Sequence, residues 1–410
     1  MIKKYSLFYL LFASLTVGAQ RINVDKITDH ISYLASDKLN GRGAGTEDEK
    51  IAAAYIAGQF RAMRLQPKGN NGFYYDFSYR HQVGDPHNLK PDSAQQRRSR
   101  NVIAFLDNGA PHTIVIGAHY DHLGLGFDHN SLDPEPAEKI HNGADDNASG
   151  VAGVIELARY LSNNGFKEKS NFLFMTFSGE ELGLIGSKKW CENPTYPLSN
   201  INYMINLDMV GRLNDSTRKL LVYGVGTSAD FIPALEKVNT YFVYKYDSSG
   251  VGPSDQTSFY LKDIPVLHFF TGQHSDYHKP TDDADKVNPK GEARILELIV
   301  DLIYALEHSP KLGFLKTRSP ENDAVSFKVT MGIMPDYTFE GPGVRIDGVG
   351  DNKPAFRAGI VKGDIILALD GTDVKDVRAY MKALSGYEKG QQAEVKILRQ
   401  GTIIFKQVTF

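Results

Sequence analysis

Short apolar segments alternate with amphipathic helices through the middle of the chain, and this alternation limits the folds that it can adopt. Six segments of mainly apolar residues have the length and composition of buried strands: 101–106, 113–118, 171–177, 201–207, 220–225 and 264–270. Four helical patterns lie between or after them: 148–161, 182–190, 229–238 and 291–307. Strands that alternate with helices form a largely parallel sheet covered on both faces. The sequence therefore predicts an α/β domain with a mostly parallel central sheet.

Two helices are expected ahead of this alternation. Residues 24–35 carry apolar side chains at helical spacing. Residues 46–63 begin with Thr46 and have Glu49 three positions later, which is the pattern of a helix capping box. The segment 81–100 further along is expected to be mobile.

Residues that can bind a metal ion follow the predicted strands. They are His119 and Asp121, Asp145 and Asp146 before the next helix, Glu180 and Glu181, Asp208, and His278. The carboxyl ends of the strands are where α/β proteins place their binding and catalytic groups. One group from each of these five places gives two imidazoles and three carboxylates, a mixture of ligands that suits zinc. If one carboxylate bridges two ions, they would lie roughly 3.5–4 Å apart.

Each of these residues also has a purely structural interpretation. Asp145 or Asp146 could be a helix N-cap, and the Glu180–Glu181 pair could be first-turn acids favoured by the helix dipole. A single histidine such as His278 could lie on the surface or in the core. Asp208 differs, because a charge at the end of an apolar strand is costly unless it is paired. The placement of all five groups at strand ends favours a metal site.

The motifs resemble those of the di-zinc aminopeptidase family that includes aminopeptidase Y and bacterial leucyl aminopeptidases. The matching pieces are Gly117-Ala118-His119-Tyr120-Asp121-His122, Gly143-Ala144-Asp145-Asp146-Asn147-Ala148-Ser149-Gly150, Ser178-Gly179-Glu180-Glu181-Leu182-Gly183, Asn206-Leu207-Asp208-Met209 and Asp276-Tyr277-His278. The resemblance covers roughly residues 24–307. It implies a zinc exopeptidase fold, aminopeptidase activity and two zinc ions per chain.

The resemblance also implies a role for each metal ligand. His119, Glu181, Asp208 and His278 would each bind one ion, and Asp146 would bridge the two. Asp146 is preferred to its neighbour because the family's bridging aspartate stands three places before a serine. In the family a cis peptide bond follows this aspartate.

Three further residues receive roles from the resemblance. Asp121 would orient the imidazole of His119. Glu180 would be the general base that takes a proton from the attacking water and passes it to the leaving amine. Tyr277 would help to hold the tetrahedral oxyanion. Gln256 stands where relatives often have histidine, which would change hydrogen bonding in the pocket but not the metal ligands.

The end of the chain has a different character. A polar linker at 309–323 precedes short strands at 326–333, 343–349, 364–369, 393–398 and 402–410, with short helices at 354–358 and 377–384. We therefore divide the chain into residues 1–19, a metal domain at 20–308, the linker, and a small β-rich domain at 324–410.

This last domain resembles a PDZ domain of the bacterial protease type. The matching pieces are Gly343-Val344-Arg345-Ile346, Pro354-Ala355-Phe356-Arg357-Ala358-Gly359-Ile360, Gly363-Asp364-Ile365-Ile366 and Asp370-Gly371. Such domains add a peptide strand to a sheet edge and hold its terminal carboxylate in a backbone nest. The nest would lie near Met331-Gly332-Ile333, where Pro335 could distort it. A packing module without a free peptide ligand is the alternative.

Residues 1–19 have the pattern of a secretory signal peptide. Lys3 and Lys4 precede the apolar run 5–17, and Val17-Gly18-Ala19 fits a cleavage site before Gln20. The run is too short to span a bilayer comfortably; a buried first helix is the alternative. We therefore expect an exported protein, periplasmic or secreted. The net charge of −3 gives no argument for a nucleic acid or an anionic membrane as partner.

The sequence thus predicts an exported zinc-dependent aminopeptidase that removes N-terminal residues from peptides. A glutaminyl cyclase or a carboxypeptidase of the same fold is the alternative, although cyclases of this fold generally use one zinc ion. A non-catalytic peptide-binding protein would be expected to lack ligands or the base, whereas Glu180 and all five ligands are present. The loop 123–142 is expected to form the rim of the substrate pocket.

Overall fold

The structure is a computed structural model that describes residues 22–82, 94–128, 130–307, 311–317, 329–335, 339, 341–350 and 353–410. The predicted signal peptide lies outside these residues, as does part of the predicted linker. None of the helices in this described part of the chain is long and apolar enough to cross a membrane.

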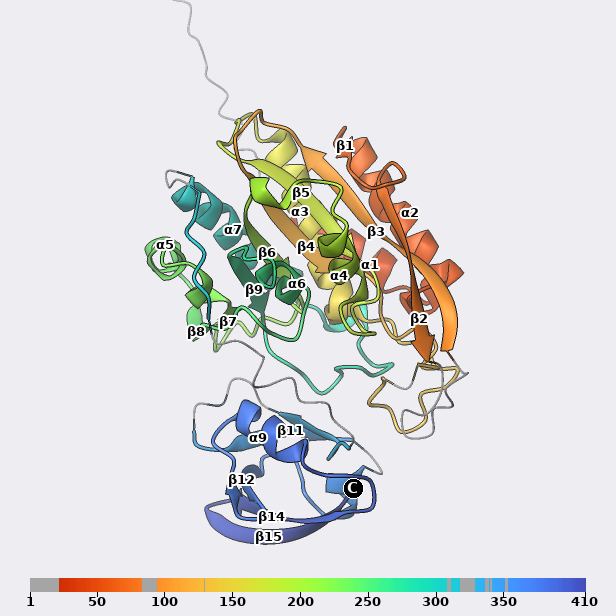
Figure 1. Ribbon diagram of the computed structural model, residues 1–410, viewed down its shortest axis with the longest axis vertical. Helices are drawn as coiled ribbons and strands as arrows, with labels where there is room; N and C mark the ends of the chain where they lie inside the picture. The colour runs from red at the N-terminus through yellow and green to blue at the C-terminus, as the bar shows by residue number, and fades with distance from the viewer. Residues whose placement is uncertain are drawn as a thin grey trace, which may run out of the picture.

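A nine-stranded sheet forms the centre of the first domain (Figure 1). Its strands are β1 (Gln66–Pro67), β2 (Tyr74–Gln82), β3 (Ala94–Leu106), β4 (Thr113–His119), β5 (Asn171–Phe177), β6 (Ile201–Leu207), β7 (Lys219–Tyr223), β8 (Val243–Asp247) and β9 (Val266–Phe270). The order is β1-β3-β5-β4-β6-β9-β7-β8, with β2 paired to β3. The central strands β5, β4, β6 and β9 are parallel, as predicted, and antiparallel pairs flank them.

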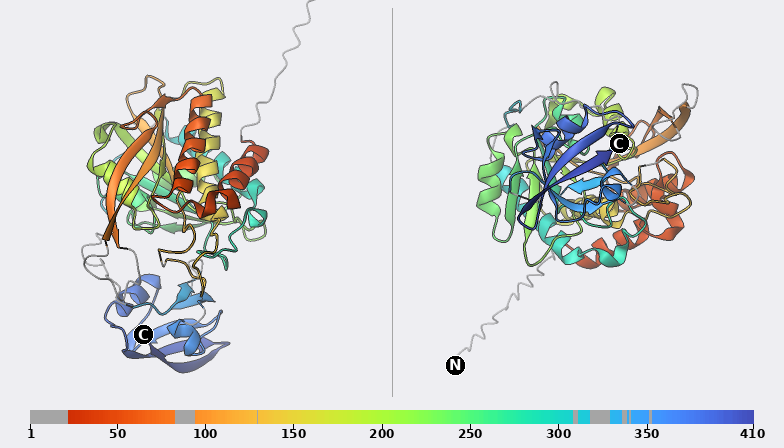
Figure 2. Two further views of the ribbon diagram at one scale, coloured as in Figure 1. Left: turned by 90° about the vertical axis from the view of Figure 1, so that its right-hand side faces the viewer. Right: turned by 90° about the horizontal axis from the view of Figure 1, so that it is seen from below.

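Helices cover both faces of this sheet, as the sequence predicts. They are α1 (Val24–Leu34), α2 (Glu47–Ala62), α3 (Gly150–Asn163), α4 (Ile185–Glu192), α5 (Phe231–Val238), α6 (Gln256–Tyr260) and α7 (Pro289–Leu306). Figure 2 shows α1, α2 and α3, coloured red to yellow, side by side on one face. Alternate residues of each central strand face opposite cores. In β4, Ile114 and Ile116 pack under these helices, whereas Val115 packs with Trp190 of α4 and Phe259 of α6.

The described residues of the segment 81–100, for which no strand was predicted before residue 101, belong to regular strands. Strands β2 and β3 form a long antiparallel ribbon that continues to the pair Gln82 and Ala94. The ribbon carries charged side chains, and Arg97 and Arg100 form ion pairs with Asp128 and Asp76. Backbone hydrogen bonds and ion pairs, not apolar contacts, stabilise this part of the ribbon. Its sequence therefore lacks the apolar alternation that would predict a strand.

The second domain contains a six-stranded sheet in the order β10-β11-β12-β14-β15, with β13 paired to β12. Its strands are β10 (Ile333–Pro335), β11 (Val344–Val349), β12 (Ile365–Leu369), β13 (Thr372–Asp373), β14 (Gln392–Arg399) and β15 (Thr402–Thr409), and its helices are α8 (Pro354–Arg357) and α9 (Val377–Leu384). The pairing of β10 with β11 shifts register between Met334 and Pro335. The domain has its own apolar core.

Candidate metal centre

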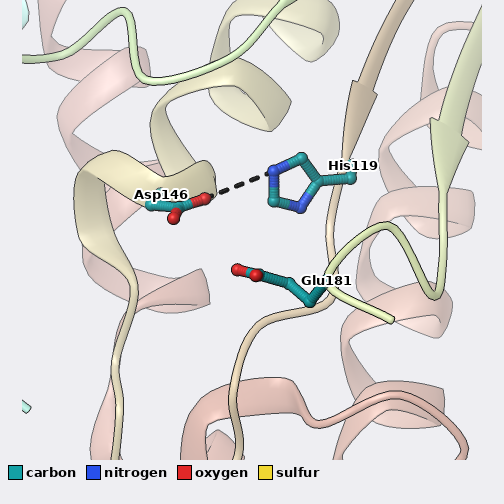
Figure 3. Close-up of side chains that lie close together, drawn as sticks. All are labelled: His119, Asp146 and Glu181. Carbon is teal, nitrogen blue, oxygen red and sulfur yellow. Dashed lines mark ion pairs between the residues drawn. The ribbon is translucent and has the colours of Figure 1, made fainter. Parts of the chain in front are cut away.

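The five predicted ligands lie together in one pocket at the carboxyl ends of the central strands. The pocket has a volume of about 130 Å³. Its lining residues include His119, Asp146, Glu180, Glu181, Asp208 and His278. They lie at or after the ends of β4, β5, β6 and β9, or in the turn before α3, as predicted. Figure 3 shows His119, Asp146 and Glu181 facing one another across this pocket.

The two carboxylate oxygens of Asp146 face two different sets of groups. Its Oδ1 lies 3.3 Å from His119 Nε2, which is itself 3.4 Å from Asp208 Oδ1. Its Oδ2 lies 3.3 Å from His278 Nε2, which is 3.1 Å from Glu181 Oε2. The arrangement has the pattern of a carboxylate shared by two ions, each with one further imidazole and one further carboxylate.

The buried carboxylates and imidazoles of the pocket also favour the binding of a cation. Burial lowers the pKa of His119, but the carboxylates of Asp208 and Glu180 outweigh it and raise that pKa well above its ordinary value. The same opposition between burial and neighbouring carboxylates raises the pKa of His278. Burial raises the pKa of the Asp146 carboxyl, but its contacts with both histidines hold that pKa well below its usual range. A buried excess of carboxylates over imidazoles fits divalent metal ions.

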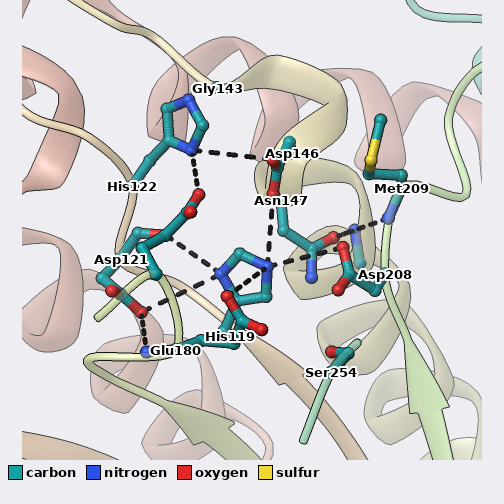
Figure 4. Close-up of polar contacts among 12 residues, drawn as sticks. His119, Asp121, His122, Gly143, Asp146, Asn147, Glu180, Asp208, Met209 and Ser254 are labelled. Atoms are coloured by element: carbon teal, nitrogen blue, oxygen red, sulfur yellow. Dashed lines mark hydrogen bonds and ion pairs between the residues drawn. The ribbon is translucent and has the colours of Figure 1, made fainter. Parts of the chain in front are cut away.

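Asp121 lies behind His119 and also contacts the backbone of Glu180. The nearest acceptor to His119 Nδ1 is the backbone carbonyl oxygen of Asp121, at 3.1 Å, and the carboxylate Oδ1 is 3.9 Å away. That Oδ1 accepts the backbone N–H of Glu180 at 3.2 Å (Figure 4). Asp121 is therefore placed to position both a proposed ligand and the proposed base.

The Glu180 side chain points into the pocket. Its Oε2 lies 3.9 Å from His119 Nε2. Burial, opposed by His119 and reinforced by Glu181, raises the pKa of the Glu180 carboxyl well above its usual range. A raised pKa suits a carboxylate that must first accept a proton and then release it.

Asp145 is directed away from this pocket. Its Oδ1 accepts the backbone N–H of Gly211 at 2.7 Å, and its Oδ2 lies 3.1 Å from His274 Nε2. The geometry therefore supports Asp146 over Asp145 as the bridging residue. The peptide bond from Asp146 to Asn147 is cis, as the resemblance implied.

The sequence analysis did not single out Asp282, which holds the backbone beside the bridging residue. Its Oδ2 accepts the N–H groups of Asp145 at 2.9 Å and Asp146 at 3.0 Å. Its other oxygen lies 3.2 Å from Arg212 Nη2. The only sequence signal is the cluster of acids after His278, which does not indicate what they contact.

Replacing Asp282 by asparagine is expected to weaken zinc binding by about 10- to 100-fold, the usual cost of losing a group that orients a ligand. The amide keeps the shape but has a single acceptor oxygen and no charge to balance Arg212. Zinc affinity is measured by competition with a chromophoric chelator. The matched control is Asp283→Asn, whose carboxylate contacts Asn142. Equal affinities in both variants would contradict this role.

His122 is a second residue for which the sequence analysis gave no role. Its Nδ1 lies 2.7 Å from Glu181 Oε1 and 4.0 Å from Asp146 Oδ2. Its ring meets that of His278 edge-on, with 5.9 Å between centroids. His122 is therefore placed to orient Glu181 from the side opposite His278. The signal was its position one residue after Asp121 at the same strand end.

Glu49 contributes more than the predicted helix cap. Its backbone N–H donates to Thr46, while its buried carboxylate accepts the N–H of Gly45 at 2.7 Å. The same carboxylate accepts the hydroxyls of Ser99 and Ser178. Burial, opposed by these hydrogen bonds, raises the pKa of the Glu49 carboxyl to about 7. Glu49 thus ties α2 to the strand end that carries the proposed base.

The loop 123–142 was expected to form the rim of the substrate pocket. Its described residues do not line the metal pocket, but some of them contact His278. The carbonyl oxygen of Asn130 lies 3.0 Å from His278 Nδ1, and the N–H of Leu132 donates to the carbonyl oxygen of His278 at 2.9 Å. Tyr277 does line the metal pocket, and its ring stacks on His278 with 3.9 Å between centroids. Gln256 lies behind the pocket, where it accepts a hydrogen bond from Asn206 at 3.2 Å.

Comparison with protein families and known proteins identifies what this chain is similar to. Residues 101–303 match the model of peptidase family M28, and residues 319–408 match that of the PDZ domain. Leupeptin-inactivating enzyme 1 of Streptomyces exfoliatus is 26% identical over 272 residues, covering 64% of this chain and 52% of that protein. Aminopeptidase YwaD of Bacillus subtilis (strain 168) is 26% identical over 236 residues, covering 53% and 46%. The chain thus spans about half the length of these two relatives.

Solved structures show the same fold. The zinc aminopeptidase BSAP from Bacillus subtilis aligns with a TM-score of 0.55 and 16% identity, covering 73% of this chain and 99% of that one. An aminopeptidase from Aneurinibacillus sp. strain AM-1 gives 0.54 and 19%, covering 73% and 97%. A glutaminyl cyclase from Bacteroides thetaiotaomicron gives 0.54 and 18%, covering 69% and 98%.

Proposed function

Because the chain carries a domain of peptidase family M28 followed by a PDZ domain, we propose that it is a zinc-dependent aminopeptidase with two zinc ions in one site. It would remove N-terminal residues from peptides. The observation that carries the proposal is the placement of Asp146, whose two oxygens face two separate pairs of histidine and carboxylate.

In this proposal the residues present would form the ligands of two ions. His119 and Asp208 would hold one ion, Glu181 and His278 the other, and Asp146 would belong to both. When bound, such ions act as Lewis acids and lower the pKa of a coordinated water. Asp121, His122 and Asp282 would keep the ligands in position.

Glu180, Tyr277 and the carboxylates around the site perform the remaining tasks in this proposal. Glu180 accepts a proton from the attacking water and later delivers it to the amine that leaves, for which its raised pKa is suited. Tyr277, in the wall of the same pocket, donates to the oxyanion of the tetrahedral intermediate. The carboxylates that surround the site attract the protonated amino terminus of a peptide, which favours an exopeptidase acting at that end.

The test compares leucyl p-nitroanilide with the same compound acetylated on its amino group. We expect hydrolysis of the free amine and a rate for the acetylated compound lower by at least about 100-fold, because a charged partner of the pocket is removed. Equal rates would overturn the aminopeptidase assignment. A peptide with N-terminal glutamine is tested in parallel, since loss of ammonia without cleavage of the chain would identify a glutaminyl cyclase instead.

Export is a further part of the proposal. It is supported by the two lysines and the apolar run within residues 1–19. N-terminal sequencing of the protein recovered from its native cells tests it, with a start near Gln20 as the expected result.

A further inference from the structure

A second cavity, of about 290 Å³, lies between the metal domain and the C-terminal domain. Leu132, Gln273 and Tyr277 line it from the metal domain. Residues before and within β10 and along α9 line it from the other side: Val329, Thr330, Ile333, Pro335, Tyr380, Met381 and Leu384. Gln273 and Tyr277 also line the metal pocket, so the two cavities share a wall. Figure 1 shows the blue C-terminal domain below the loops that follow β4 and β9.

The C-terminal side of this cavity has the form of a peptide groove. Strand β10 is an edge strand of its sheet and, among the described strands, pairs only with β11. Its other edge can therefore accept the backbone of an added strand. Helix α9 forms the opposite wall, where Met381 and Leu384 join Ile333 and Tyr380 in a mainly apolar lining. Such a groove selects an extended peptide with an apolar side chain.

The start of β10 suits the end of such a peptide. Gly332 has a φ of 73°, a left-handed conformation that favours glycine. The stem of Lys353 packs against Gly332, since a Cβ atom there would meet Lys353 Cβ at 2.1 Å. The PDZ family, whose model matches residues 319–408, holds the terminal carboxylate of a peptide in a backbone turn of this kind.

The wall on the metal-domain side is made by the segments that hold a proposed zinc ligand. The N–H of Leu132 donates to the carbonyl oxygen of His278, and the ring of Tyr277 stacks on the His278 imidazole. The metal pocket is small, at about 130 Å³, so the rest of a bound peptide must extend out of it. The cavity between the domains shares Gln273 and Tyr277 with the metal pocket and is the space next to it.

We propose that the groove binds the carboxyl-terminal end of the same peptide whose amino terminus lies in the metal pocket. The inference rests on the proposed aminopeptidase function and narrows its substrates to short peptides with a free carboxylate and an apolar last residue. The shared wall is the reason for preferring one peptide to two. The tail of a second protein in the groove would contact Tyr277, which also lines the metal pocket, and would occupy the space next to that pocket.

The test uses the full-length, zinc-loaded protein and peptides of three to eight residues that begin and end with leucine. Each peptide is supplied as the free acid and as the C-terminal amide, and leucyl p-nitroanilide serves as a substrate too short to reach the groove. We expect one peptide length at which the acid has a kcat/KM roughly tenfold above the amide, through a lower KM. The advantage should decline for longer peptides.

A pair of variants on α9 locates the effect. Met381→Glu places a carboxylate in the groove and is expected to remove the preference for the free acid, read as the ratio of peptide to anilide kcat/KM. Lys382→Glu places the same group on the next, exposed side chain and is expected to keep the preference. The comparison of acid with amide on the unmodified protein does not depend on either variant folding.

Equal rates for acid and amide at every length, in protein that hydrolyses the anilide, would overturn this inference and leave the proposed function standing. Activation of anilide hydrolysis by an N-acetylated peptide acid would overturn it as well, since the groove would then belong to a separate ligand. A zinc-loaded protein that does not hydrolyse the anilide would overturn both.

Discussion

Replacing Glu180 by glutamine is expected to lower kcat by about 10²- to 10⁴-fold while zinc remains bound, because the amide cannot accept the proton of the attacking water. Glu180 lines the pocket but is not needed to complete either set of ligands around Asp146. Its backbone N–H, held by Asp121, is unchanged by the substitution. Turnover of leucyl p-nitroanilide and zinc content are measured on the same sample.

The neighbouring residue supplies a matched control. Glu181→Gln makes the same chemical change one position later, where the carboxylate lies 3.1 Å from His278 Nε2 and 2.7 Å from His122 Nδ1. This variant is expected to lose zinc as well as activity. If Glu180→Gln kept near-normal turnover, or lost zinc as Glu181→Gln does, the role of Glu180 as general base would be wrong.

The second large effect is expected from Asp146→Asn, which should lose both zinc ions and with them all measurable activity. Asparagine presents one acceptor oxygen where two are needed to face His119 and His278. Loss of a group that merely orients a ligand weakens metal binding by about 10- to 100-fold, so loss of the shared ligand should cost at least the upper end of that range. Zinc per chain is measured by mass spectrometry of the metal after dialysis.

Asp145→Asn is the control for this substitution, because Asp145 directs its carboxylate to Gly211 and His274 instead of the pocket. It is expected to retain two zinc ions. Thermal unfolding of both variants separates loss of metal from loss of fold. Two ions retained by Asp146→Asn would contradict the assignment of Asp146 as the bridge.

The sequence was sufficient to predict the central sheet and the pocket because the two share one signal. Apolar runs such as 113–118 and 171–177 mark strands, and a charged residue directly after such a run stands out. Parallel strands then bring their carboxyl ends to the same edge. His119, Asp208 and the Glu180–Glu181 pair were found in this way, and the structure brings them together. The choice of Glu181 as the ligand came from the family resemblance.

The groups that hold the ligands could not be predicted from local patterns. Asp282 contacts Asp146 across 136 positions of sequence, and Glu49 contacts Ser178 across 129. Nothing near either residue indicates such a partner. Glu49 fitted a helix cap, which is correct for its backbone N–H but does not account for its carboxylate.

The cavity between the two domains also could not be predicted from the sequence. The two domains could be separated by composition, yet no pattern indicated that Tyr277 would line both the metal pocket and the groove beside α9. Contacts between domains depend on how their surfaces fit together. Hydrophobic periodicity predicts the helices and strands within a domain but not which surfaces meet.

The central claim, two zinc ions sharing Asp146 in one hydrolytic site, is tested most directly by titrating metal-depleted protein with Zn²⁺ while hydrolysis of leucyl p-nitroanilide is followed. The proposal predicts that activity is absent without metal, rises with added zinc and reaches its plateau at two ions per chain. A plateau at one ion per chain, or full activity in the metal-depleted protein, would contradict it.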